Sequence, residues 1–350
     1  MKTGSNTNKE RMRAQRLRKQ RRRRRRIRRL CTVLIILMIA GLTVFISGRI
    51  LLGQENKDII SGYTAASEPA EAESESEEPS LSVDVEKLYS PYCILEQLDT
   101  GKILASRQKG TRIYPASLTK IMTAILAIEN TPDLDQTIPL PDALFSSLYV
   151  QNASMAGFQP GEEASGRDLL YGILLPSGAE CCLAFADNIA GSERDFVGMM
   201  NRKADQLGME NTHFCNSTGL HDENHYSTAE DIAVLLRYAL NNEEFRKVFT
   251  ASRYSTSPSA LHPDGFTFYS SMFQYMETAQ FPGGEILGGK TGYTSEAGLC
   301  LASLARIGDT EYILVTAGAA GDHQTKPYHI LDAESVYSQI GNRSALPGYA

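Results

Sequence analysis

Residues 30–48 form a run of 19 residues without a charged side chain, and an arginine stands at each end of it. A helix of this length extends about 28 Å, close to the roughly 30 Å thickness of the hydrocarbon core of a bilayer. A buried helix of a globular domain is a poor alternative, because the sequence RRRRRRIRR leads directly into the run. The sequence therefore predicts a single membrane-spanning helix at residues 30–48.

The charges on the two sides of this run differ in sign. The first 30 residues carry 15 Lys and Arg against one acid, whereas the rest of the chain carries 20 Lys and Arg against 40 Asp and Glu. Because cationic segments remain in the cytoplasm, we expect residues 1–29 to form a cytoplasmic tail and the bulk of the chain to lie outside the cell membrane. Each cation near the surface also gains about 1 kcal/mol from anionic lipids.

Two other interpretations of the N-terminus are weaker. A cleaved signal peptide would have a shorter basic region and an A-x-A cleavage site after the apolar run. A nucleic-acid-binding tail would be expected to interleave aromatic residues or to carry a base-reading motif, and the tail shows neither. We therefore expect an uncleaved anchor in the cell membrane and no nucleic-acid partner.

The segment that follows is rich in acidic residues. The sequence EPAEAESESEEP, at residues 68–79, contains six glutamates and no basic residue. Like charges repel and nothing apolar is present to collapse, so residues 49–85 are predicted to be a disordered spacer. The globular domain is expected at residues 86–350.

Six cysteines are present, one of them in the predicted anchor. Outside the cell disulfides are allowed, and one bridge from Cys215 to Cys181 or Cys182 stays open beside the interpretation that most of these thiols are buried apolar groups. The cysteines do not have the spacing of zinc ligands. His221 and His225 have the spacing H-x-x-x-H, but the sequence HDENH is typical of a loop. We expect neither a metal site nor a cofactor.

The hydrophobic pattern of the domain predicts its helices and strands. Residues 92–107 alternate in polarity around an Asp-Thr-Gly turn, which is typical of a β-hairpin. Apolar residues recur at helical spacing from Ser117 onward. Further helices are predicted within 166–191 with a break at 176–178, from Thr228, and at 332–340, and strands at 284–294, 298–306 and 311–319. Since strands lie at both ends of the domain, we expect an α+β fold, with a sheet built from the two ends and a helical insertion covering it.

Three short elements carry residues that could converge on one site. Ser117 and Lys120 lie three residues apart at a helix start, so their side chains share a face. Ser177 lies in the break between two helices, where it can point into a cleft. Lys290 and Thr291 lie on a strand whose neighbouring glycines leave room for a substrate backbone.

This combination suits nucleophilic catalysis. A serine is a weak nucleophile until a base takes its proton. A lysine can be that base when burial and a second cation lower its pKa from about 10.4 toward about 7–8. We therefore expect Ser117 to be the nucleophile, Lys120 to be the desolvated base, and Lys290 to be the second cation.

These motifs resemble those of the penicillin-binding D-alanyl-D-alanine carboxypeptidases, serine peptidases of bacterial cell walls. The resemblance rests on PASLTK, LLPSGAECC and GGKTGYTSEAGLCLASLAR, and extends to LLYGILLPSG, LGMENTHFCNSTGL and HYSTAEDIAVLL. It implies a penicillin-recognising fold, with a mainly antiparallel sheet flanked by helices and a helical subdomain beside it. It also implies peptidoglycan stem peptides as substrates and β-lactams as inhibitors. The small C-terminal β-domain of many members is not expected here.

The resemblance assigns roles residue by residue. Ser117 matches the acylated nucleophile, Lys120 its base, and Ser177 the serine that relays a proton to the leaving amine. Lys290 and Thr291 match the pair that binds the terminal carboxylate of the substrate. The backbone N–H groups of Ser117 and Tyr293, which follows Gly292 in the same substrate-binding motif, match the oxyanion hole.

The sequence departs from the family at two places. The second motif of the family is Ser-x-Asn, and here its third position is Ala179. Many members also have an arginine before the last helix, whereas this chain has Lys326 and His329 there. The expected function is removal of the terminal D-alanine of stem peptides through an acyl-enzyme. The alternatives are a catalytically weak penicillin-binding scaffold, which Ala179 suggests, and a β-lactamase, for which no deacylating glutamate loop is evident.

Overall fold

The computed structural model describes residues 83–344 of the chain. The predicted cytoplasmic tail, the predicted anchor and most of the predicted acidic spacer therefore lie outside the described residues. Within residues 83–344, no helix is long and apolar enough to cross a membrane. Val83 and Val85, at the start of the described residues, are buried.

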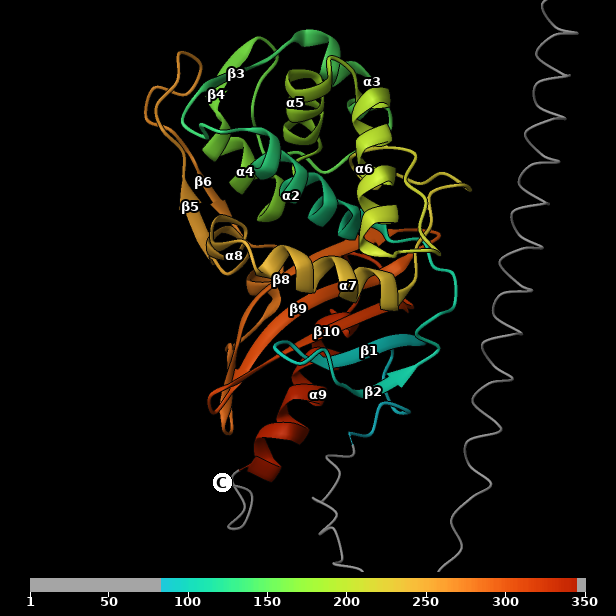
Figure 1. Cartoon of the computed structure of the whole chain (residues 1–350). Coiled ribbons are helices and arrows are strands. Elements are labelled where there is room, and N and C mark those ends of the chain that lie inside the picture. Colours follow the sequence, from blue (N-terminus) through green and yellow to red (C-terminus); the bar gives the residue numbers. More distant parts are fainter. Residues whose placement is uncertain (1–82, 345–350) are drawn as a thin grey trace, which may run out of the picture. The chain divides into compact units, whose positions relative to one another are not determined.

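A six-stranded antiparallel sheet joins the two ends of the domain, as the sequence predicts (Figure 1). The first two strands form the predicted hairpin, and the first of them pairs with the last strand, where Ile94 lies opposite Val315. In spatial order the strands are β2 (Ile103–Arg107), β1 (Tyr92–Gln97), β10 (Thr310–Ala319), β9 (Gly298–Ile307), β8 (Gly284–Thr294) and β7 (Gln280–Phe281).

Helices cover both faces of this sheet. On one face the closing helix α9 (Tyr328–Ser344) packs against β9 and β10. It begins four residues before the predicted start, and the Asp332 carboxylate accepts hydrogen bonds from the backbone of Tyr89 and Ser90, which fastens the N-terminal segment. On the other face lies α7 (Ala229–Leu240), whose N-cap is Thr228, as the sequence predicts.

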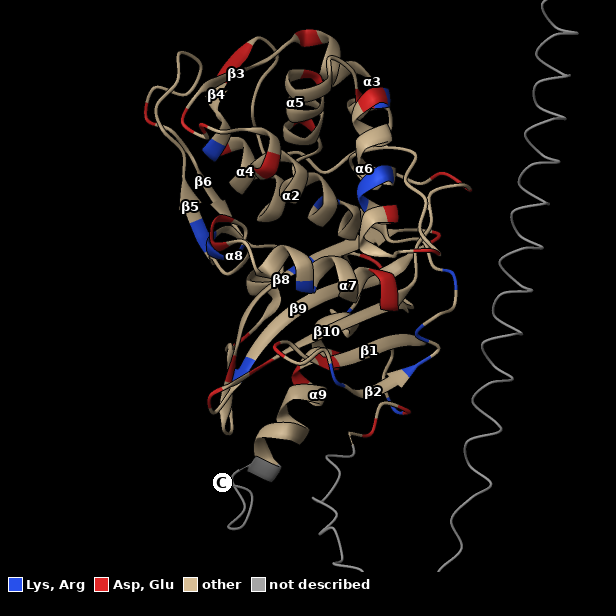
Figure 2. Ribbon diagram, viewed as in Figure 1, with Lys and Arg blue, Asp and Glu red and all other residues tan. Residues whose placement is uncertain are grey.

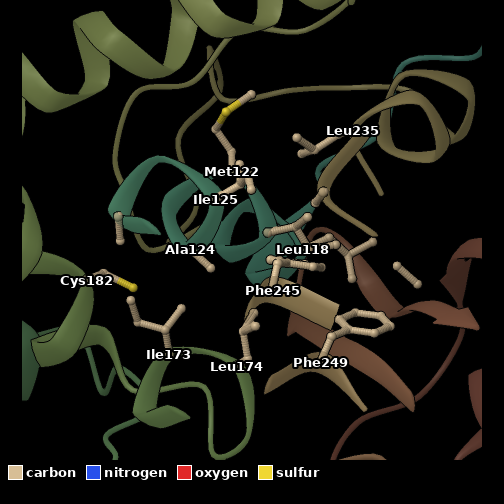
Figure 3. Packing of buried hydrophobic residues seen from close by; sticks show 14 of the residues in the cluster. Leu118, Met122, Ala124, Ile125, Ile173, Leu174, Cys182, Leu235, Phe245 and Phe249 are labelled. Carbon is tan, nitrogen blue, oxygen red and sulfur yellow. The ribbon is translucent and has the colours of Figure 1, made fainter. Parts of the chain in front are cut away.

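The helical part of the domain lies on the side of α7 that faces away from the sheet (Figure 1). Its central helix is α2 (Lys120–Asn130), and Figure 3 shows side chains of the Leu118 to Ile125 stretch packed with Ile173, Leu174 and Phe249. The surrounding helices are α3 (Phe145–Val150), α4 (Gly166–Leu174), α5 (Ala179–Ala190), α6 (Glu193–Leu207) and α8 (Glu243–Phe249). Two small two-stranded antiparallel sheets complete it, β3 (Thr137–Leu140) with β4 (Glu162–Ser165) and β5 (Arg253–Ser255) with β6 (Thr267–Tyr269).

Local sequence explains where these helices start and stop. The side chains of Ser165, Ser192 and Asn242 accept a hydrogen bond from the backbone N–H three residues on, which satisfies a donor that the helix leaves unpaired. Gly191 and Gly208 end their helices in the left-handed conformation that glycine adopts without strain. Figure 2 shows charged residues spread over the outer helices, loops and strand ends of the described domain.

All five cysteines of the described chain are free. The bridge from Cys215 to Cys181 or Cys182, which the sequence left open, is therefore not formed. Cys181 and Cys182 are buried on α5, which agrees with their interpretation as apolar core residues.

Candidate active site

The first serine–lysine pair lies at the start of α2. Ser117 belongs to a short 3-10 helix (Ala116–Thr119), and α2 follows from Lys120, so the predicted helix opens with a tighter turn. The Lys120 Nζ donates hydrogen bonds to the Ser117 Oγ at 3.1 Å and to the carbonyl oxygen of Thr218 at 2.6 Å. Lys120 is only 2% exposed. The sequence prediction that this lysine is desolvated beside the serine is confirmed.

A close approach of two backbones holds this turn in place. A Cβ at Gly219 would lie 1.9 Å from the carbonyl oxygen of Ala116, and Gly219 has φ +83°, so only glycine fits there. Ala116 itself has φ +47°, which is uncommon for a residue with a Cβ. The loop that carries Thr218 is thereby pressed onto the Ser117 turn.

The second serine–lysine pair joins the helical part to the sheet. Ser177 lies in the predicted break between α4 and α5, and Lys290 lies on β8. The Lys290 Nζ donates to the Ser177 Oγ at 3.0 Å and to the carbonyl oxygen of Thr291 at 2.7 Å. Lys290 is fully buried. Ser177 has φ +71°, a strained conformation that is typical of functional sites.

Strand β8 brings the two pairs together. A Cβ at Gly292 would lie 3.0 Å from the backbone nitrogen of Ser117, so the missing side chain lets the strand approach the nucleophile. The Thr291 hydroxyl forms a hydrogen bond of 2.6 Å with the Ser271 hydroxyl. Tyr293 stands next on the strand, and its ring contacts that of His323.

Burial shifts both lysines toward the neutral form. Desolvation lowers the pKa of Lys120, although the charge of Glu180 partly opposes this. Desolvation and, second, the charge of Lys120 lower the pKa of Lys290 well below its usual range. Because two ammonium groups in one buried site repel each other, the site disfavours carrying both charges. The direction expected for the pKa of Lys120 therefore follows from its burial, and the charge of Lys290 does not contribute to it.

A cavity of about 180 Å³ opens in front of both pairs. Of the predicted site residues, Ser117, Ser177, Thr291, Gly292 and Tyr293 line it, while Lys120 and Lys290 contact it from behind through the two serine hydroxyls. Sequence reasoning missed the other residues of the lining, because they have no recognisable spacing. Leu299 lies on β9, Gln274 and Tyr275 lie in a 3-10 turn, and the rest lie on loops: Ser154, Pro176, Ser271, Asp322, His323, Thr325 and Pro327.

The two candidates for reading a substrate carboxylate differ in the structure. His329 lines the cavity, is buried, and has an Nδ1 atom without a hydrogen-bond partner in the described structure. Lys326 is exposed and does not line the cavity. Burial lowers the pKa of His329 to about 4, so at neutral pH it offers a neutral imidazole rather than a cation.

Ala179, which replaces the family asparagine, lies in an apolar environment. It is 1% exposed and packs in a small cluster with Leu148 and Leu183, against which Met155 and Leu220 also pack. The neighbouring Glu180 does not fill the space of the missing amide, because its Oε1 accepts hydrogen bonds from the backbone N–H groups of residues 156 and 157.

The histidine pair of the sequence has a structural role. The buried His225 bonds through its Nε2 atom to the Thr119 hydroxyl, and its Nδ1 accepts from the backbone N–H of Cys215. His221 lies against the ring of Tyr114. No cluster of three or more His, Cys, Asp or Glu residues suited to a metal occurs between residues 83 and 344.

Comparisons with known proteins agree on one family. A sequence profile of the D-alanyl-D-alanine carboxypeptidase family matches residues 79–321. The chain is 39% identical over 236 residues to the D-alanyl-D-alanine carboxypeptidase DacF of Bacillus subtilis, covering 65% of this chain and 57% of that protein. It is 29% identical over 271 residues to a D-alanyl-D-alanine endopeptidase of Pseudomonas aeruginosa, covering 76% of this chain and 82% of that protein. The chain thus spans little more than half the length of DacF and of the Escherichia coli relative DacD, of which it also covers 57%.

Solved structures give the same result. The DD-transpeptidase of Streptomyces K15 superposes with a TM-score of 0.64 at 27% identity, covering 72% of this chain and 97% of that one. The D-alanyl-D-alanine carboxypeptidase of Mycobacterium tuberculosis gives a TM-score of 0.64 at 26% identity, covering 76% and 96%.

Proposed function

This chain belongs to the D-alanyl-D-alanine carboxypeptidase family, and from that premise we propose that it removes the terminal D-alanine of peptidoglycan stem peptides. The observation that carries this proposal is the convergence of two buried serine–lysine pairs on one cavity. One pair supplies an activated nucleophile, and the other supplies a proton for the leaving group. β-Lactams, which acylate enzymes of this kind, are the expected inhibitors.

In the first step Ser117 is the nucleophile. As its Oγ bonds to the carbonyl carbon of the penultimate D-alanine, the neutral Lys120 amine takes the hydroxyl proton across the 3.1 Å hydrogen bond. The electron pair of the carbonyl moves onto its oxygen. The backbone N–H groups of Ser117 and Tyr293 are proposed to stabilise that oxyanion, since donors are needed where the charge develops.

In the second step the amine leaves. Collapse of the tetrahedral intermediate breaks the bond to the terminal D-alanine, whose nitrogen takes a proton from the Ser177 hydroxyl. Ser177 regains a proton from the protonated Lys120, which returns to the neutral amine, while the hydrogen bond from Lys290 holds the Ser177 hydroxyl in place. Water then attacks the ester on Ser117: the neutral Lys120 accepts a proton from the water and returns it to the Ser117 Oγ as the ester bond breaks. Thr291 and its partner Ser271 present hydroxyls to the carboxylate of the leaving residue.

The membrane anchor at residues 30–48 is a further part of this proposal. The 19-residue uncharged run and the arginines before it support a single-pass protein with its N-terminus in the cytoplasm and this domain at the wall. Protease added to intact protoplasts should release the domain by cleaving the acidic segment. A domain that stays protected until lysis would contradict this topology.

The activity is tested with the purified full chain in detergent. A peptide ending in D-alanyl-D-alanine should release D-alanine, and a labelled penicillin should acylate Ser117 and turn over slowly. Penicillin binding without D-alanine release would indicate a scaffold, and rapid turnover of the penicillin would indicate a β-lactamase. An added acceptor amine shows whether the acyl group passes to water or to an amine.

A further inference from the structure

Glu180 is a buried carboxylate to which the proposed mechanism gives no role. It is 0% exposed and lies in the first turn of α5, three residues after Ser177. Its Oε1 accepts hydrogen bonds from the backbone N–H groups of Ala156 at 2.7 Å and Gly157 at 2.9 Å. Its Oε2 is buried without a hydrogen-bond partner in the described structure. A polar group buried at this cost calls for an explanation.

The segment that Glu180 holds lies against the Ser177 turn. The backbone N–H of Ala179 donates to the carbonyl oxygen of Ser154 at 2.8 Å, and the N–H of Gly178 donates to that of Gly172 at 2.8 Å. A Cβ at Gly178 would lie 2.6 Å from the Cβ of Ala156, so the two backbones are in close contact there. Residues 154–157, the Ser177 turn and the start of α5 therefore form one hydrogen-bonded ring, which the Glu180 side chain closes.

The Ser177 turn depends on such a ring. Ser177 has φ +71°, and a side-chain-bearing residue stays in that conformation only where its surroundings over-determine it. The turn aims the Ser177 hydroxyl at Lys290, 3.0 Å away. If residues 154–157 moved off Gly178, the turn could relax and the hydroxyl would leave this position.

We infer that Glu180 is a positioning residue: by fixing residues 154–157 it keeps the Ser177 turn closed and the Ser177 hydroxyl on Lys290. The effect of this clamp on catalysis rests on the proposed function, whereas the clamp itself does not. The clamp acts through the accepting oxygen of Glu180, so an amide at this position can replace the carboxylate.

The test compares Glu180→Ala with Glu180→Gln in the full chain. Glu180→Ala should slow acylation by a labelled penicillin roughly 10- to 100-fold, because small displacements of catalytic groups have effects of that size. Glu180→Gln keeps an oxygen that can accept both N–H groups and should restore the rate to within about threefold of wild type. In a Ser177→Ala background, Glu180→Ala should slow acylation by no more than about threefold, because the hydroxyl it positions is gone.

A second buried carboxylate provides the matched control. Glu162 accepts from the backbone N–H of Gln159 and bonds to Ser259 and His262, none of which lines the cavity. Glu162→Ala should lower stability but leave the acylation rate of the folded protein unchanged. Normal acylation in Glu180→Ala, equal losses in the Gln and Ala variants, or full additivity with Ser177→Ala would each overturn the inference.

Hydrogen exchange separates this inference from the proposed function. Glu180→Ala should speed exchange of the Ala156 and Gly157 amides, and Glu162→Ala should not. If the wild-type chain acylates neither penicillin nor peptide, the proposed function fails, and the exchange data alone decide on the clamp. Unchanged exchange at these two amides in Glu180→Ala would show that the clamp does not exist.

Discussion

Ser117 and Lys120 lie three residues apart in adjoining helical turns, whereas Ser177 and Lys290 lie 113 residues apart and belong to a helix break and a strand. Both lysines are buried and both donate to a serine hydroxyl at similar distances. The first pair is built by local geometry and needs tertiary packing only to remove water from it. The second pair exists only because α5 and β8 are held together.

This difference has a chemical consequence. In a local pair the hydrogen bond is set by the geometry of one helical turn, so the base stays next to the nucleophile. The hydrogen bond of the second pair joins the helical part of the domain to the sheet, so its length changes when either part shifts. The proposed role of this pair is to act on the leaving amine and on the substrate carboxylate. The following changes are expected to separate the two pairs.

We expect the largest difference between the alanine variants of the two serines, in their labelling by penicillin. Ser117→Ala should abolish covalent labelling by a labelled penicillin, because no other hydroxyl has a base in the same position. Ser177→Ala should retain labelling at a rate lower by roughly 10²- to 10⁴-fold, the range that a proton-transfer group contributes. Mass spectrometry of the labelled peptide gives the site, and label found on another residue in the wild type would refute the assignment.

We expect the second-largest difference between the arginine variants of the two lysines, in their acylation rates. Lys120→Arg keeps the charge but cannot lose it, so acylation should fall by roughly 10²- to 10⁴-fold. Lys290→Arg keeps N–H donors that can reach the Ser177 hydroxyl and should reduce the acylation rate less. Lys203→Arg, at a half-buried ion pair with Glu129 outside the cavity, is the control and should leave the rate unchanged. A greater loss in Lys290→Arg than in Lys120→Arg would exchange the two roles.

Below the first pair, His225 should make stability depend on pH. Burial lowers its pKa from 6.5 to about 4, so the folded state prefers the neutral ring. The contribution of the neutral His225 ring to the free energy of unfolding is therefore fully present above pH 6.5. It decreases as the pH drops toward 4, by about 1.4 kcal/mol per pH unit. In His225→Gln the free energy of unfolding should vary less with pH by this amount. The exposed His213→Gln serves as the control, and an equal pH dependence in the His225 variant and the wild type would contradict the expectation.

Near the second pair, His329 should contribute to carboxylate binding. His329→Ala should raise KM for a D-alanyl-D-alanine peptide about 10-fold with little change in kcat, the size expected for one hydrogen bond to a charged group. Lys326→Ala should leave KM unchanged, since Lys326 does not line the cavity. If both variants keep the wild-type KM, Thr291 and Lys290 are sufficient for the carboxylate.

We expect the smallest change in the rate of D-alanine release from Ala179→Asn, two residues after Ser177. One neutral hydrogen bond to the substrate is worth about 0.5–1.5 kcal/mol, or roughly 2- to 12-fold in rate. The amide would enter the apolar cluster of Leu148 and Leu183, so thermal stability should fall. An increase above 100-fold in D-alanine release would instead show that the wild-type chain is the catalytically weak scaffold.

Much of the fold was predictable because its signals are periodic and local. Alternation in residues 92–107, the helical spacing after Ser117 and the break at 176–178 each depend on neighbours within a few residues, and all three predictions are confirmed. The pairing of the first strands with the last followed from their positions at the two ends of the domain. The starts of the Ser117 helix and of the last helix were displaced, because a 3-10 turn and tertiary contacts decide helix ends.

The first serine–lysine pair could be predicted from the amino-acid sequence, since a spacing of three residues at a helix start places both side chains on one face. The members of the second pair were predicted from the resemblance to the family motifs. Three features became visible in the folded structure alone: Ser177 forms a hydrogen bond with Lys290, His329 rather than Lys326 lines the cavity, and Glu180 closes a ring around the Ser177 turn. The reason is physical: these contacts join segments far apart in the chain, and their geometry is set by close packing, which no local pattern records.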